Sequence, residues 1–316
     1  MAIKKYNHLL PRMIIKRWKE CEGKIYNKNT EKTINVSKNN YAKKYYYSLG
    51  KKDDKLENRI ANFESYVGNL LKKINKIESK CIEFSIKDME ILKLYVVLQS
   101  CRNDNTSPVI LDDESGFYRN NDYLFGIPLI KTQEEAIEWT SIICDEFDGL
   151  KKLTDNEIID QYKNGFLYKE KLPLNTIGQH LVIVNNNSNA FIVSEVTSII
   201  ECSIDNNYML TYVPVSPKIG LILANSKYFF NSENIQNEKI KKCDEYLSME
   251  IEDEKLVFNG DIFKSAIKIN FVKLNEHEIN CLNSIIFEDG NKILFSNEDF
   301  LNKAKERNKS RHISLY

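Results

Sequence analysis

Hydrophobic residues change their spacing near residue 175, and this change restricts the fold of the chain more than any other feature. Before it, apolar side chains recur at helical intervals, as in 56–74, where Leu56, Ile60, Phe63 and Val67 share one stripe. After it, short apolar runs alternate with polar turns, at 180–184, 190–193, 197–200, 209–213 and 219–223. Helices followed by strands predict an α+β fold, with a mainly helical N-terminal layer and a C-terminal antiparallel sheet.

Further elements are expected on both sides of this change. The spacing predicts helices over 9–18, 85–102, 134–150 and 155–162, a short hairpin from 23–26 and 33–36, a late helix over 274–287, and a strand over 292–295. The basic tail, 303–312, is expected to fray. We divide the 316 residues into a mainly helical half, 1–170, and a mainly sheet half, 171–316, which we expect to form one compact unit.

Charge is distributed unevenly along a chain whose net charge is zero. Residues 1–50 contain 12 Lys or Arg against 3 Glu, whereas residues 103–160 contain 4 basic and 14 acidic side chains. The basic end can attract a nucleic acid or a nucleotide, and the acidic segment, densest at 112–114, can dock a basic protein partner. The alternative is that the two regions face each other inside the fold.

Several common chemistries are absent from the sequence. There is no glycine-rich nucleotide loop, no Gly-x-Ser-x-Gly nucleophile motif and no Cys-x-x-Cys pair, and the four histidines are scattered, so we expect neither a metal nor a cofactor. The odd number of cysteines, 7, fits free thiols in a reducing compartment. The start, 1–5, is followed by no signal-type apolar run, and the run 91–98 is too short to cross a bilayer. We therefore expect a cytoplasmic protein without a membrane partner.

Polar residues at the end of the buried helix 85–102 suggest a site. Tyr95, Gln99 and Arg102 are spaced to share one helix face, and the helix is apolar nearly all round before them. A guanidinium at the end of a buried helix needs a carboxylate, a carbonyl or an anionic ligand beside it. Glu64, close to the apolar stripe of 56–74, is a candidate partner.

The run from His8 to Trp18 resembles the opening motif of a family of uncharacterised bacterial proteins, domain of unknown function 4238. His8, Pro11, Lys16 and Trp18 match that motif, and Leu9 replaces its usual aromatic residue. The resemblance extends over roughly 6–225, and the alternative is that it continues to the C-terminus. It implies no known activity.

Later positions also resemble the family. Lys44 and Tyr47 fit a Lys followed by aromatic residues, and Glu64 and the run 99–102 match family features. The strand 191–195 resembles one that ends in Ser/Thr-Asp-x-Pro, but Glu195 replaces the Asp and Thr197 the Pro. The run 213–217 matches a Pro-Leu-Ser-Pro stretch of the family.

These matched positions define a hypothetical site. The candidate catalytic residues are His8, Glu64, Arg102 and Glu195, and the candidate ligand-binding residues are Arg12, Lys16, Lys44, Tyr47 and Gln99. An imidazole can move a proton near neutral pH, cations can hold phosphate oxygens, and a carboxylate can orient the imidazole or carry a second proton. Metal-independent cleavage of a phosphodiester, as in a nuclease of a toxin or phage-defence system, needs little more.

Two functional alternatives and one structural alternative stay open. The basic N-terminal region can bind an anionic ligand or nucleic acid without chemistry, or the acidic segment can make the chain an interaction scaffold. Structurally, an ion pair of Arg102 with Glu64 or Glu195 can simply fix the helical layer to the sheet.

Overall fold

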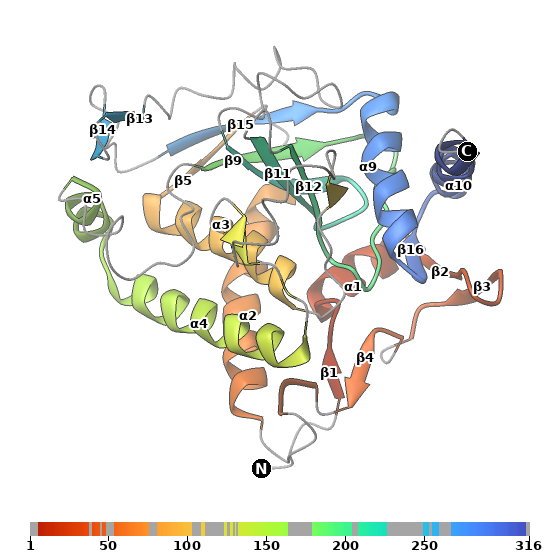
Figure 1. Ribbon diagram of the computed structural model, residues 1–316, viewed down its shortest axis with the longest axis horizontal. Helices are drawn as coiled ribbons and strands as arrows, with labels where there is room; N and C mark the ends of the chain where they lie inside the picture. Colours follow the sequence, from red (N-terminus) through yellow and green to blue (C-terminus); the bar gives the residue numbers. More distant parts are fainter. Residues whose placement is uncertain are drawn as a thin grey trace.

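A seven-stranded sheet forms the middle layer of the protein, as seen in a computed structural model (Figure 1). The structure describes residues 6–37, 40–44, 46–48, 54–75, 81–102, 109–110, 123–124, 127–128, 130, 132–163, 179–203, 208–225, 249–252, 255–258 and 267–313. Across the sheet the strands are β5 (Cys81–Phe84), β15 (Ile267–Lys273), β9 (Gln179–Asn185), β12 (Ile219–Asn225), β11 (Tyr208–Pro214), β10 (Ile199–Ser203) and β6 (Val109–Ile110).

The sheet is antiparallel at its centre and mixed at its flanks. Strands β9, β12, β11 and β10 pair antiparallel, as predicted, whereas β15 pairs β9 and β10 pairs β6 in parallel. Strands β5 and β6 precede residue 170 and the other five follow it, so both halves of the chain contribute to one sheet. The α+β class is confirmed, while the division at residue 170 stays a prediction.

Both faces of the sheet are buried, and alternate residues of one strand serve opposite faces. Leu181 and Ile183 pack with α2 (Lys55–Asn75), α3 (Ile86–Cys101) and α4 (Gln133–Lys152). Val182 and Val184 pack instead with α1 (Arg12–Glu20), α9 (Glu276–Asp289) and β16 (Lys292–Phe295). The elements of the N-terminal half therefore lie on both faces of the sheet.

Helix α3 lies between the sheet and the helices α2 and α4 (Figure 1). It begins after Ser85, whose Oγ accepts a hydrogen bond from the Asp88 N–H at 3.1 Å. Every residue from Met89 to Cys101 is buried, because neighbouring elements surround the helix. Polar side chains in its last turns are consequently shielded from water.

Smaller elements complete the described chain. The predicted hairpin is confirmed as β2 (Lys24–Asn27) and β3 (Lys32–Asn35), and β16 joins it to make a three-stranded sheet. The remaining elements are the paired strands β1 (Tyr6–His8) and β4 (Ala42–Lys44), the 3₁₀ turn η1 (Tyr46–Ser48), the pairs β7 (Tyr123–Leu124) with β8 (Ile127–Pro128) and β13 (Met249–Glu252) with β14 (Lys255–Phe258), and the helices α5 (Asp155–Lys163) and α10 (Glu298–Ile313).

One predicted strand is absent. The apolar run 190–193 forms only a single bridge, between Val193 and Leu294. The side chain of Asn283 takes the place of a neighbouring strand there: its Nδ2 donates to the Ala190 carbonyl at 2.8 Å, and its Oδ1 accepts from the Ile192 N–H at 3.2 Å. The run is apolar because it is buried in the core, and its backbone groups form hydrogen bonds without pairing along a neighbouring strand.

The two ends of the chain also differ from expectation. The first helix begins at Arg12 and not at Leu9, with Pro11 as the residue that precedes it. The prediction of a frayed tail is wrong, because α10 continues to Ile313. Phe300, Leu301 and Ala304 are buried in the core, and this packing supports the helix that the basic composition obscured.

Candidate functional site

The last turns of α3 and the residue that follows it carry polar side chains inside the protein, among them Tyr95, Gln99 and Arg102. Tyr95 and Gln99 have no exposed surface and Arg102 has 1%. Their spacing places them on one face of the helix, as the sequence indicated. Elements α2 and η1 contribute the other groups beside this face.

Arg102 forms a buried ion pair with Glu64. Arg102 Nη1 donates to Glu64 Oε1, and the side chains are 1% and 16% exposed. Burial by itself lowers the pKa of Arg102, but Tyr47 and Glu64 outweigh burial, and the pKa is raised above its usual value. Arg102 therefore stays protonated, and of the two predicted partners Glu64 is the one that it contacts.

Tyr47 lies against the same guanidinium. Burial raises the pKa of Tyr47 to about 12, although the charge of Arg102 and a hydrogen bond with it act in the opposite direction. Turn η1, which carries Tyr47, is held by Gln133, whose Nε2 donates to the Tyr46 carbonyl at 2.6 Å. The phenol of Tyr47 is thus neutral at physiological pH and fixed beside Arg102.

Tyr95 and Gln99 have unusual surroundings for core residues. Within the part of the chain that the structure describes, the Tyr95 hydroxyl and both polar atoms of the Gln99 amide are buried without a hydrogen-bond partner. Burial raises the pKa of Tyr95, Glu64 raises it further, and Arg102 and Arg17 lower it. Because buried polar groups are paired in more than about nine cases of ten, these atoms call for an explanation.

We name Tyr47, Glu64, Tyr95, Gln99 and Arg102 the polar centre. It joins four predicted residues to one that the prediction of site residues missed, Tyr95. The shared helix face of Tyr95, Gln99 and Arg102 was the signal that could have included it.

Two charged neighbours of the polar centre were also missed. Glu57, on α2, raises the pKa of Arg102 and of Tyr47, and Arg17, on α1, acts on Tyr95. Glu57 precedes Glu64 by seven residues, a spacing that indicates a shared helix face. No sequence signal separated Arg17 from the exposed cations around it.

Arg12 and Lys16 lie on the exposed face of α1. They line a surface hollow of about 470 Å³ together with Lys19 and Ser37. Lys16 is 77% exposed and its Nζ lies 3.6 Å from Glu20 Oε1. The fold thus separates these two predicted ligand-binding residues from the buried polar centre.

Glu195 is bonded to the turn that precedes β16. Its Oε1 and Oε2 accept from the N–H groups of Asn291 and Lys292, each at 2.9 Å. The segment that carries Glu195 also contacts α3, because Thr197 Oγ1 donates to the Gln99 carbonyl at 2.8 Å. The carboxylate of Glu195 fixes this turn, whereas the partner of Arg102 is Glu64.

For His8 and Lys44 the structure describes the backbone, and their side chains lie outside the described atoms. Strand β1 pairs antiparallel with β4 (Figure 1). In this pairing His8 lies opposite Ala42, and Tyr6 lies opposite Lys44. Strand β1 also contacts η1, the turn that carries Tyr47. The strand that carries His8 therefore lies beside η1, the turn of the polar centre.

Other predicted features fall partly or wholly outside the described residues. The acidic cluster 112–114 is among them, so the scaffold hypothesis for 103–160 stays a prediction. Within the described ranges, no three His, Cys, Asp or Glu side chains gather as metal ligands, and no helix has the length and apolarity to cross a bilayer.

These observations define a class: an α+β protein with a mixed central sheet and a buried polar centre between α2, α3 and η1. The chain belongs to the family described as Protein of unknown function (DUF4238), whose model matches residues 6–300. No curated protein and no solved structure matches the chain. The family membership expected from His8, Pro11, Lys16 and Trp18 is thereby confirmed.

Proposed function

We propose that the polar centre binds the anionic group of a phosphorylated ligand, a nucleotide or a nucleic acid, and that phosphodiester cleavage is the second candidate function. The observation that supports binding most directly is the pair of buried, unpartnered polar groups of Gln99 and Tyr95 beside Arg102.

An unpaired amide in the interior is costly. Leaving a buried donor or acceptor without a partner costs about 1–3 kcal/mol each, and a purely structural site has no reason to keep such a group. The Gln99 amide offers one donor group and one acceptor side by side, which is the pattern that glutamine uses to pair with the edge of a nucleobase. The guanidinium of Arg102 acts on the neighbouring Tyr95 and can balance a ligand phosphate.

The ion pair by itself does not account for this arrangement. Glu64 and Arg102 fix α2 to α3 with or without a ligand. An apolar side chain of similar volume at position 99 would avoid the cost of burying an unpartnered amide, so a purely structural site could have used Met or Leu there. We therefore assign the fixing of α2 on α3 to the pair of Glu64 and Arg102, and the hydrogen bonds to the ligand to Gln99 and Tyr95. The charge of Arg102 also balances the ligand phosphate.

Catalysis is favoured by one observation, the pairing of β1 with β4 next to η1. On this proposal the imidazole of His8 takes the proton of the attacking hydroxyl as its oxygen bonds to phosphorus, and the bond from phosphorus to the leaving oxygen breaks as that oxygen takes up a second proton. Arg102 stabilises the phosphate charge in the transition state, and Glu64 orients the imidazole or carries the second proton. No metal takes part in these steps.

Replacing Gln99 with Met tests ligand binding. We expect the free energy of unfolding to rise by about 1–2 kcal/mol, because an unpartnered amide is removed at nearly constant volume. We expect binding of a labelled single-stranded RNA or of a mononucleotide at low salt to weaken about tenfold. Chemical denaturation and fluorescence anisotropy measure the two effects.

Gln133→Met is the matched control for stability. Gln133 uses its amide to hold the Tyr46 carbonyl, so the same substitution should lower the free energy of unfolding by about 1 kcal/mol. Should Gln99→Met be less stable than the wild type and bind both probes equally well, the Gln99 amide is structural and the proposal fails. If the wild type binds neither RNA nor a mononucleotide at low salt, both are excluded as ligands of the polar centre.

Replacing His8 with Ala tests catalysis. If the chain cleaves a labelled RNA in the presence of EDTA, His8→Ala should lose that cleavage by about 100-fold or more while RNA binding and folding persist. His277→Ala is the matched control, because His277 is exposed at the start of α9. Undiminished cleavage by His8→Ala, or none by the wild type, leaves binding as the function.

A further inference from the structure

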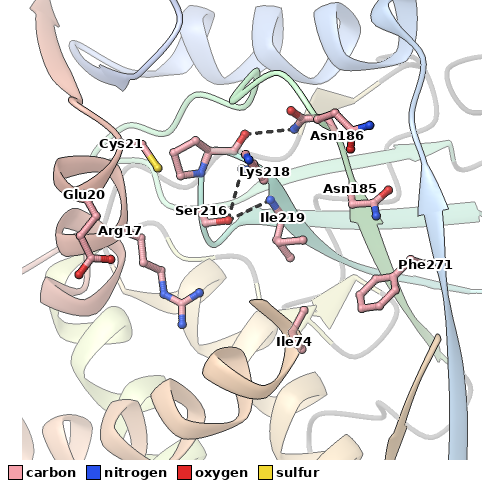
Figure 2. Close-up of a pocket in the computed structure, with 12 residues that line it drawn as sticks. Arg17, Glu20, Cys21, Ile74, Asn185, Asn186, Ser216, Lys218, Ile219 and Phe271 are labelled. Carbon is pink, nitrogen blue, oxygen red and sulfur yellow. Dashed lines mark hydrogen bonds between the residues drawn. The ribbon is translucent and has the colours of Figure 1, made fainter. Parts of the chain in front are cut away.

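A second cavity lies between the C-terminal end of α1 and the turn that joins β11 to β12 (Figure 2). Its volume is about 320 Å³. The residues that define its chemistry are Arg17, Ile74, Asn185, Ser216, Lys218 and Phe271. None of them belongs to the polar centre or to the residues predicted from the sequence.

Arg17 is the principal charge of this cavity. Burial lowers the pKa of Arg17, and Tyr95 and Glu20 only partly oppose that effect. Its Nη1 is buried without a hydrogen-bond partner, and no carboxylate forms an ion pair with it in the described part of the chain. A partly desolvated guanidinium without a counterion is costly, and a bound anion would supply the missing charge.

Ser216 provides a second donor. Its Oγ accepts hydrogen bonds from the Lys218 and Ile219 N–H groups at 3.3 and 3.0 Å. A hydroxyl has two acceptor positions and one proton, so with both acceptor positions used the O–H of Ser216 can only donate. Lys218 is exposed at the same turn and adds a positive charge.

The opposite side of the cavity is less charged. Figure 2 shows Arg17 extending from α1, with Asn185 and Phe271 across the space from it. Asn185 Oδ1 is buried without a hydrogen-bond partner among the described residues, and Ile74 and Phe271 supply apolar surface. Glu20, the carboxylate in the lining, is 61% exposed and lies 3.6 Å from Lys16, which offsets its charge.

We propose that this cavity binds a small organic anion, a carboxylate or a phosphate monoester. The charged group of the ligand contacts Arg17 and Ser216, its apolar or aromatic body lies against Ile74 and Phe271, and a hydroxyl or N–H of the ligand donates to Asn185. The volume is at the lower end of the range for ligand pockets, which suits a small molecule and not a polymer. The proposal does not rest on the function proposed for the polar centre, because neither Gln99 nor Arg102 lines this cavity.

The test uses three probes of similar size and the full-length protein. Phenyl phosphate and benzoate carry the two anionic groups, and benzyl alcohol is neutral. In titrations followed by ligand-observed NMR, we expect the wild type to bind at least one anion and to bind benzyl alcohol about tenfold more weakly or not at all. The better anion identifies the ligand class.

Arg17→Gln should weaken binding of that anion by about tenfold or more, whereas Lys19→Gln, which removes an exposed charge from the same helix, should leave it unchanged. Asn185→Asp is a second variant that preserves side-chain size, and its carboxylate should repel the anion and weaken binding as well. Gln99→Met should bind as the wild type does, which separates this site from the polar centre.

Three results would overturn the proposal. They are the binding of neither anion by the wild type, equal binding of the neutral probe, and unchanged binding by folded Arg17→Gln or Asn185→Asp.

Discussion

Arg102→Met is expected to lower the free energy of unfolding by about 3 kcal/mol. The substitution preserves much of the side-chain volume but leaves Glu64 without the guanidinium that it contacts. Removing one partner of a buried ion pair costs about 3–5 kcal/mol, and we take the lower end because Glu64 is 16% exposed and retains some contact with water. Chemical denaturation of the wild type and the variant measures the difference.

Arg59→Met is the matched control for this prediction. Arg59 also connects α2 to α4 through ion pairs, with Asp145 at 2.6 Å and Asp148 at 3.2 Å, but its side chain is 31% exposed. An exposed pair contributes about 1 kcal/mol or less, so the same substitution should cost far less there.

A double substitution isolates the ion pair. Adding Glu64→Leu to Arg102→Met removes the isolated carboxylate and should restore about 2 kcal/mol. If Arg102→Met costs no more than Arg59→Met, or if Glu64→Leu deepens the loss, the two side chains do not act as a coupled buried pair.

Glu146→Gln is expected to stabilise the protein at pH 8 by about 2 kcal/mol and to have little effect near pH 5. Burial in α4, together with repulsion from Asp145, raises the pKa of Glu146 from 4.5 to about 8. At pH values between 4.5 and about 8, the Glu146 carboxyl group is ionised in the unfolded chain and protonated in the folded chain. The folded state therefore binds more protons, and stability falls as pH rises through this interval.

Glutamine removes that dependence because it stays uncharged at every pH. The measurement is the difference in unfolding free energy between Glu146→Gln and the wild type at pH 5 and at pH 8. Glu138→Gln, at an exposed position of the same helix, is the control and should shift neither value. An equal difference at both pH values would show that Glu146 is ionised in the folded protein.

The sequence predicted that Arg102 has a buried acceptor, because α3 is apolar nearly all round and a cation at its end needs a partner. Glu64 was a candidate because the periodicity of α2 places it close to the buried face of that helix. Sequence distance carries no information about the partner, so Glu64 and Glu195 were equal alternatives. The structure chose Glu64 because α2 packs directly on α3, whereas Glu195 is bonded to the backbone that precedes β16.

The roles of the cations near the N-terminus could not be predicted from the sequence. Arg12, Lys16 and Arg17 look alike in the sequence, and the first two were selected as ligand contacts. In the fold, Arg12 and Lys16 are exposed, whereas Arg17 lies half-buried in the second cavity. Arg17 differs from Arg12 and Lys16 in the side of α1 on which it lies relative to the sheet. That side depends on where α1 begins and how it packs.

The amino-acid sequence alone determined the change from helices to strands, the burial of α3 and the family to which the chain belongs, because hydrophobic spacing and short motifs are local properties. The tertiary structure alone decided which polar side chains meet. In the folded protein Glu64 pairs with Arg102. Gln99 and Tyr95 have polar atoms without hydrogen-bond partners among the described residues, and Arg17 lies across the second cavity from Asn185. These contacts depend on how elements that are far apart in the sequence pack against each other, and periodic patterns along the sequence do not predict that packing.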